Sequence, residues 1–173
     1  GEDLKAAGEL VVLFGDSIQG AAVGELVAFL DSLGVPAKYI CLVDYSNSRG
    51  ACDMGLLPHL GPGYQAAAQT GMSMAEMLAD PSLDALWVVG ANPLAGAALA
   101  SQKAFVVVQD MFLTETAQRA DVVLPSASPY EKAGTVTNTC GQVQRLRKAI
   151  SVMGAKDALD ILGLLARGMN LDL

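Results

Sequence analysis

The feature that most constrains the fold of this chain is the repeated alternation of a short apolar run with a helical pattern. Leu10 to Phe14 is an unbroken apolar run that ends at Gly15, which is typical of a strand buried on both faces. Residues 20–33 follow with apolar side chains at helical spacing, and Gly34 and Pro36 end this helix. Because strands that alternate with helices form parallel pairs with right-handed crossovers, the sequence predicts an α/β fold.

The same alternation continues through the rest of the chain. We predict further strands over residues 37–43, 84–89, 104–109 and 122–124, and helices over 73–79, 93–101, 114–119 and 156–167. Residues 126–140 are expected to form a polar loop, followed by an extended or irregular segment at 142–149. The prediction is a Rossmann-like, doubly wound, mostly parallel sheet with helices on both faces. With 173 residues and roughly 150 residues per domain, residues 1–173 are expected to form a single domain.

A long connection over residues 44–71 interrupts this regular pattern. It contains Gly50, Gly55, Pro58 and a Gly61-Pro62-Gly63 turn, and one helical turn is expected over 51–56. Connections of this length inside a compact domain are usually functional or packed against another element. After it, Ser73 and Glu76 have the spacing of a capping box at the start of a helix.

Composition excludes several classes of protein. Apolar residues make up 52% of the chain and charged residues 17%, which excludes a disordered tail. The net charge of −7 gives no cationic surplus for binding nucleic acid. The three cysteines are far apart and lack the spacing of a metal site or a disulfide framework, so a reducing, cytoplasmic setting is expected. The longest weakly polar stretch, 86–100, is too short and interrupted to insert into a membrane. Since the chain begins with Gly1, we expect a fragment of a larger subunit.

A hydrolase is a remote alternative. The segment Gly15-Asp16-Ser17-Ile18 resembles the nucleophile block of GDSL-type esterases. A serine nucleophile needs a neighbouring imidazole to accept its proton, but the single histidine of the chain, His59, lies in the long connection. The alternative interpretation is that residues 15–17 turn the chain and cap the next helix.

Polar and glycine residues follow the predicted strands, at Gly90-Ala91-Asn92-Pro93, Gln109-Asp110 and Pro125-Ser126. In an open parallel sheet these carboxyl ends meet at one edge, where ligands bind. Gly90 would allow a backbone to approach closely, while Asn92 and Asp110 offer donors and acceptors for a base or ribose. The same residue types also form ordinary turns between strands and helices.

Several segments together resemble a signature of the molybdopterin oxidoreductase superfamily. They are residues 47–51, 54–58, 62–64, 90–93, 106–110, 114–117, 120–125 and 131–139, so the resemblance covers most of the chain from Leu10 to Val143. This superfamily includes formate dehydrogenases and the large iron–sulfur subunit of NADH-quinone oxidoreductase. The resemblance implies a Rossmann-like domain inside a larger subunit.

The resemblance also implies a cofactor site. In molybdenum-containing relatives such segments hold the guanosine part and line the cleft of a molybdopterin guanine dinucleotide. The positions that it marks are Gly90, Asn92, Pro93, Asp110, Glu131, Lys132, Gly134 and Asn138. Iron–sulfur clusters and the metal ligand would belong to the rest of the parent subunit. We therefore expect no catalytic or metal-binding residue in this chain, which alone should bind no cofactor and be inactive.

The glycine-containing segment at 131–142 distinguishes two branches of the superfamily, the formate dehydrogenases and the NADH-quinone oxidoreductase subunits. Cys140 and Gln142 stand where formate dehydrogenase-like members have a glutamate and an arginine, so two charged groups are missing. The blocks at 47–51 and 55–58 also look more like the NADH-quinone oxidoreductase branch. The favoured interpretation is a scaffold domain in electron transfer from NADH to quinone, and the alternative is the guanosine-binding domain of a formate dehydrogenase-like enzyme. Either implies neighbouring domains and subunits as partners, at the cytoplasmic face of a membrane.

Overall fold

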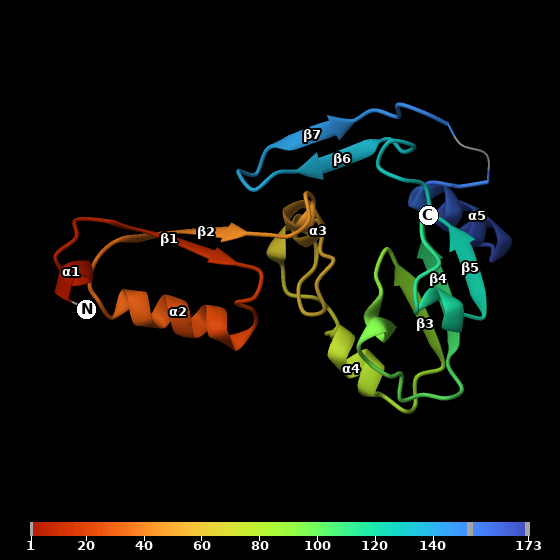
Figure 1. Ribbon diagram of the computed structural model, residues 1–173, viewed down its shortest axis with the longest axis horizontal. Coiled ribbons are helices and arrows are strands. Elements are labelled where there is room, and N and C mark those ends of the chain that lie inside the picture. Colours follow the sequence, from red (N-terminus) through yellow and green to blue (C-terminus); the bar gives the residue numbers. More distant parts are fainter. Residues whose placement is uncertain (1, 152–153, 172–173) are drawn as a thin grey trace. The chain divides into compact units, whose positions relative to one another are not determined.

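The computed structural model describes residues 2–151 and 154–171, and these form two compact units (Figure 1). The first unit holds the chain up to Leu56 together with Pro62–Tyr64 and Val136–Gln144. The second unit holds Leu57–Gly61, Gln65–Thr135 and the segment that begins at Arg145.

The first unit is built on a pair of parallel strands. In chain order it contains α1 (Glu2–Lys5), β1 (Leu10–Gly15), α2 (Ala21–Asp31), β2 (Ala37–Leu42), α3 (Ser48–Asp53) and the 3-10 turn η1 (Pro62–Tyr64). β1 and β2 pair in register from Leu10 opposite Ala37 to Gly15 opposite Leu42. Gly34, at φ +70°, ends the turn between α2 and β2 in a conformation that favours glycine. The predicted strand, helix and strand are confirmed here.

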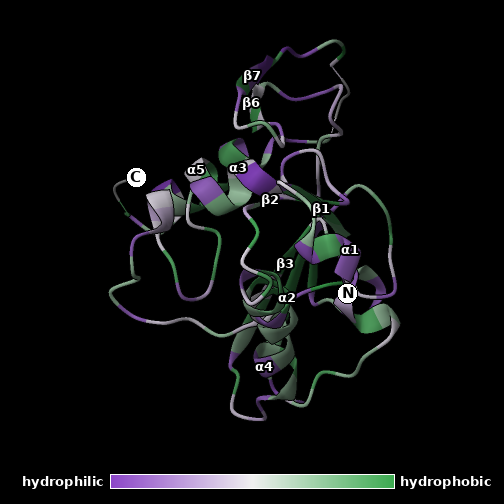
Figure 2. Cartoon of the chain, turned by 90° about the vertical axis from the view of Figure 1, so that its left-hand side faces the viewer, coloured by the Kyte–Doolittle hydropathy of each residue, from purple (hydrophilic) through white to green (hydrophobic). Residues whose placement is uncertain are grey.

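The second unit is built on three parallel strands in the order β3-β4-β5. It contains α4 (Met74–Ala79), β3 (Ala85–Val89), η2 (Pro93–Ala95), β4 (Phe105–Asp110), η3 (Ala117–Arg119), β5 (Val122–Pro125) and α5 (Ala158–Gly168). One face of the sheet carries the core, since the register pairs Leu86 with Val106 and Val88 with Val108, and all four are buried. The apolar residues of β3 are drawn in green in Figure 2.

A further two-stranded sheet consists of β6 (Gly134–Thr137) and β7 (Val143–Leu146). It corrects the expectation that residues 126–140 form only a loop. The extended segment expected over 142–149 is confirmed as β7. Thr135, Val136 and Thr137 are β-branched, and such residues favour strands even in a short polar segment.

The α/β class is confirmed, with parallel sheets flanked by helices, although the strands pair in more than one sheet. The helix predicted over 93–101 is wrong beyond a single 3-10 turn, Pro93–Ala95. Gly96 follows this turn, and glycine inside a helix costs about 1 kcal/mol relative to alanine. The helix predicted over 114–119 is likewise reduced to a turn at Ala117–Arg119. That residues 1–173 form a single domain stays a prediction.

Candidate functional site at the strand ends

The predicted strand-end residues follow two neighbouring strands of the second unit. Gly90 comes directly after β3, and Asp110 is the last residue of β4. The N–H of Gly90 donates to the carbonyl of Gln109 at 2.9 Å, which ties the two strand ends together. Gly90 has φ +60°, and an added Cβ would meet nothing within 4 Å, so the space beside its backbone is open. Asp110 Oδ1 accepts from the N–H of Phe112 at 3.0 Å, which fixes the carboxylate beside the turn after β4.

Asn92 is engaged inside the protein. Its Oδ1 accepts from the N–H of Thr116 at 3.0 Å and from the Thr116 hydroxyl at 2.8 Å, while its Nδ2 donates to Glu115 Oε2 at 2.6 Å. The Thr116 hydroxyl also accepts from the N–H of Leu94 at 3.0 Å, and Thr116 is fully buried. We call these four residues, Asn92, Leu94, Glu115 and Thr116, the strand-end network. Within it, Asn92 fastens the segment after β3 to the segment after β4.

The strand-end network also lowers the pKa of one of its members, Glu115. The hydrogen bond from Asn92, followed by a backbone hydrogen bond, holds the pKa of Glu115 below its usual value. A carboxylate that accepts hydrogen bonds is stabilised in its charged form. Glu115 therefore strengthens the network as long as it is ionised.

Glu131, Lys132 and Gly134 belong to the second unit. Hydrogen bonds from the Ser128 side chain and from the Ser128 N–H, which lies 2.8 Å from Glu131 Oε2, lower the pKa of Glu131. Glu131 and Lys132 line a polar cavity of about 450 Å³ with Lys148 and Lys156. Gly134 is the first residue of β6.

Asn138 belongs to the first unit and closes a turn. Its Oδ1 accepts from the N–H of Gln142 at 2.9 Å, and its Nδ2 donates to Gln142 Oε1 at 3.1 Å. The backbone N–H of Asn138 also donates to the carbonyl of Gln142 at 3.1 Å. The resemblance implied a cofactor contact here, whereas the structure shows an amide engaged by its own turn. Gln142, which stands where relatives were expected to carry an arginine, is the partner.

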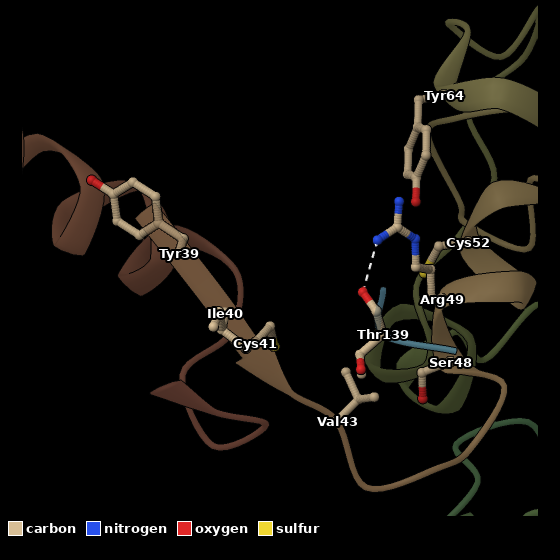
Figure 3. A pocket seen from close by; sticks show the side chains of 9 residues that line it. All are labelled: Tyr39, Ile40, Cys41, Val43, Ser48, Arg49, Cys52, Tyr64 and Thr139. Carbon is tan, nitrogen blue, oxygen red and sulfur yellow. Dashed lines mark hydrogen bonds between the residues drawn. The ribbon is translucent and has the colours of Figure 1, made fainter. Parts of the chain in front are cut away.

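A second cavity, of about 370 Å³, lies in the first unit (Figure 3). Its lining includes Tyr39, Cys41, Arg49, Cys52, Tyr64 and Thr139. Arg49 Nη1 donates to the carbonyl of Thr139 at 2.9 Å, the dashed line in Figure 3. The Tyr64 hydroxyl donates to Asp53 Oδ1 at 2.6 Å, and this bond is the main cause of a raised pKa of Tyr64. Sequence reasoning did not predict this cavity.

Two separate blocks of the sequence signature meet beside this cavity. Asn47 Oδ1 accepts from the N–H of Thr137 at 2.9 Å, as Arg49 binds the carbonyl of Thr139. Gly141 has φ +83°, a backbone conformation that favours glycine, and it lies beside the guanidinium of Arg49. The blocks at 47–51 and 131–139 are therefore joined by hydrogen bonds in the first unit.

The hydrolase alternative gains no support. Ser17 lies in the turn after β1, where the N–H of Ile18 donates to the carbonyl of Gly15 at 3.1 Å. The turn is confirmed, but the expected cap is wrong, because Gly20 occupies the N-cap of α2 and no side chain caps it. His59 belongs to the second unit, where its carbonyl accepts from the N–H of Ala67.

Two features are absent from the described part of the chain. Over residues 2–151 and 154–171, no three histidine, cysteine, aspartate or glutamate side chains gather as a metal site would require. Over the same ranges, no helix has the length and apolar character that crossing a bilayer demands.

Comparison with known proteins gives consistent matches. The family described as molybdopterin oxidoreductase matches residues 9–167. The F420-dependent formate dehydrogenase subunit alpha of Methanocaldococcus jannaschii is 40% identical over 135 residues, 63% of this chain and 20% of that protein. Formate dehydrogenase H of Escherichia coli is 37% identical over 134 residues, 61% of this chain and 19% of that protein.

A relative from the other branch matches over a longer stretch. An NADH-quinone oxidoreductase subunit of Rhizobium meliloti is 33% identical over 174 residues, which cover 83% of this chain and 20% of that protein. The chain thus spans about a fifth of the length of these curated relatives.

Proposed function

Because the chain belongs to the molybdopterin oxidoreductase family, we propose that it is a domain of a larger oxidoreductase subunit that holds the guanosine part of a molybdopterin guanine dinucleotide. The observation that carries the proposal is the pair of strand ends at Gly90 and Asp110. They follow adjacent parallel strands, and the space beside Gly90 is open. Ligands of open parallel sheets bind at this edge.

The residues present fit such a group in part. Gly90 leaves room for close approach, and the carboxylate of Asp110 can accept from the N–H groups of guanine. Asn92 and Asn138 fit less well, since their amides are engaged within the protein. When bound in the parent enzyme, the cofactor supplies the redox chemistry through its metal. The part of this chain is to bind and orient the nucleotide.

The identities support a formate dehydrogenase-like parent, since the formate dehydrogenases named above match at 40% and 37%. In that parent, Glu131, Lys132 and Gly134 would line the cofactor cleft, and Pro93 would shape the loop after β3. Its partners would be other domains and subunits of a formate-oxidising complex at the cytoplasmic face of a membrane. Iron–sulfur clusters would be held outside this chain.

A second candidate is a scaffold domain in the large iron–sulfur subunit of an NADH-quinone oxidoreductase. The engaged amides of Asn92 and Asn138 favour it, because a relic site would keep these residues for structure alone. The match to the Rhizobium meliloti protein covers 83% of this chain. In that parent the domain would contribute stability and contacts to a respiratory complex, without binding a nucleotide.

Calorimetric titration with GDP, and with ADP as a control, tests the proposal. We expect the 173-residue chain to prefer GDP and Asp110→Ala to weaken GDP binding by about tenfold or more, since a charged hydrogen-bonding partner is lost. Asp84→Ala is the matched control. Asp84 directly precedes β3, at the amino end of the strands, so its replacement should leave GDP binding unchanged. Equal binding of GDP and ADP, or no effect of Asp110→Ala, would contradict the proposal.

Elemental analysis of the purified parent separates the two candidates independently. Molybdenum or tungsten close to one atom per subunit is expected for the cofactor-binding domain. Iron without either metal would support the scaffold.

A further inference from the structure

A cavity of about 370 Å³ lies in the second unit at the amino ends of the strands, and we call it the amino-end cavity. Its lining includes Val106, near the start of β4, and Asp121, which directly precedes β5. Gly90 and Asp110 mark the opposite, carboxyl ends of the strands, so the amino-end cavity is separate from the strand-end site. Ligand pockets in proteins measure about 300 to 1,000 Å³, and this cavity falls within that range.

The amino-end cavity lies where the connection from β3 to β4 is irregular. Parallel sheets are usually covered by the helices of their crossovers, but this connection forms only the 3-10 turn Pro93–Ala95. Farther along, the N–H of Ala100 donates to the carbonyl of Leu78 at 2.8 Å, and the Ser101 hydroxyl donates to the carbonyl of Leu83 at 2.6 Å. These bonds fasten the connection to the segments before β3, and the space beside it stays open.

One wall of the amino-end cavity is aliphatic. Leu94 is 4% exposed and Val106 is 5% exposed, so both are fixed parts of the protein interior. Leu99 is half-buried and packs against the core of the sheet. An apolar group that entered the cavity would leave water for this wall, which favours its binding.

Two opposite charges line the same cavity. Asp121 is held in place, because its Oδ2 accepts from the N–H of Val106 at 2.7 Å and its own N–H donates to the carbonyl of Val106 at 2.9 Å. Its Oδ1 has no hydrogen-bond donor among the described residues. Arg119, the last residue of η3, forms no ion pair over residues 2–151 and 154–171, while Glu115, one turn earlier, accepts from Asn92. A guanidinium and a carboxylate oxygen therefore remain available beside the aliphatic wall.

We propose that the amino-end cavity binds a small zwitterion, an α-amino acid with an aliphatic side chain. The guanidinium of Arg119 suits the carboxylate of the ligand, since its paired N–H groups match two carboxylate oxygens. Asp121 Oδ1 would accept from the ammonium group, and the side chain of the ligand would pack against the aliphatic wall. A phosphate or a nucleotide would instead place negative charge beside Asp121, which is unfavourable. The inference is independent of the proposed function, because it uses the other edge of the sheet.

NMR titration of the isotope-labelled 173-residue chain with L-leucine tests the inference. We expect saturable shifts of the amide signals of Val106 and Asp121, because both amides adjoin the carboxylate that would bind the ammonium group. Isocaproate lacks the ammonium group of leucine, and isopentylamine lacks its carboxylate. Each is expected to bind about tenfold or more weakly than leucine, since one charged group of the cavity is left without a partner.

Arg119→Gln and Asp121→Asn are each expected to weaken leucine binding by about tenfold or more. The asparagine keeps an oxygen for the N–H of Val106, so the chain should stay folded. Arg147→Gln is the matched control, because Arg147 is exposed and does not line the cavity. Ala98→Leu keeps both charges but narrows the cavity, so it should weaken leucine binding and, at an exposed position, leave the thermal unfolding midpoint unchanged.

Three results would overturn the inference. They are the absence of saturable shifts with leucine, equal affinities for leucine and isocaproate, and leucine binding that survives both Arg119→Gln and Asp121→Asn. Each of them would leave the GDP titration, and with it the proposed function, untouched.

Discussion

At the scale of single residues, hydrogen bonding divides the amides of the strand ends into two groups. Asn92 uses both ends of its amide to join two segments of the second unit, and the Thr116 it holds is fully buried. Gln109, in β4, has an amide donor, Nε2, for which the described residues supply no partner. The sequence shows that Asn92 follows one apolar run and that Gln109 follows another. Only the folded structure shows which amide is already engaged.

Asn92→Ala is expected to destabilise the chain by about 1–3 kcal/mol, because it leaves the buried N–H and hydroxyl of Thr116 without their acceptor. Urea unfolding followed by circular dichroism measures the effect. Gln102→Ala, at an exposed position, should change the free energy of unfolding by less than about 0.5 kcal/mol. Equal free energies of unfolding for the two variants would show that the strand-end network does not stabilise the fold.

Glu115 makes the strand-end network sensitive to acid. Its pKa is lowered in the folded chain, so its stabilisation is fully present above the unfolded value of about 4.3 and is lost as the pH falls through the lower, folded value. We expect Glu115→Gln to lose less stability than the wild type between pH 7 and pH 3. Urea midpoints at both pH values test this. An equal loss in the two proteins would contradict the prediction.

At the scale of helices and strands, local sequence patterns predicted correctly the elements that local interactions stabilise. The capping box of α4 is confirmed: the N–H of Glu76 donates to Ser73 Oγ at 3.3 Å, and the N–H of Ser73 donates to Glu76 Oε2 at 2.7 Å. The helix expected over 93–101 ends after one 3-10 turn because the N–H of Ala100, which would bond to Gly96 in a helix, donates instead to the carbonyl of Leu78 at 2.8 Å. Alanine and leucine favoured a helix, and a tertiary hydrogen bond overrode them.

Ser73→Ala is expected to lower the free energy of unfolding by about 1 kcal/mol, since the first turn of α4 loses the side-chain acceptor of its cap. Ser73→Thr keeps a hydroxyl and should retain most of the stability. Chemical denaturation of the three proteins gives the comparison. A threonine variant as unstable as the alanine variant would show that the serine acts in some other way.

At the scale of the whole molecule, the order of the signature blocks along the chain did not predict which of them are in contact. The signature blocks at 47–51 and 131–139 were recognised separately. In the structure Asn47 is hydrogen-bonded to Thr137 and Arg49 to Thr139, and each pair is 90 residues apart in the sequence. No local pattern encodes such a pairing. In the same way, alternating strands and helices predicted parallel sheets, but not which strands would share one.

Each parallel sheet also leaves apolar residues open to solvent. In the first unit Leu13 and Ile40, which are partners in the register, are 62% and 43% exposed. In the second unit the exposed Trp87 and Phe105 lie on the face opposite the core. Parallel sheets in folded proteins are normally covered on both faces. The proposed parent subunit, several times as long as this chain, offers further domains to cover them.

Trp87 can report on this cover, since it is the only tryptophan of the chain. At 41% exposure in the isolated chain, its fluorescence should be red-shifted and readily quenched by acrylamide. In a parent variant whose other tryptophans are replaced by phenylalanine, emission from Trp87 should shift to the blue and quenching should fall, because an apolar neighbour excludes water from that face. A Trp87→Phe version of that parent gives the background to subtract. Equal quenching in the isolated chain and the parent would mean that this face stays open to solvent in the full subunit.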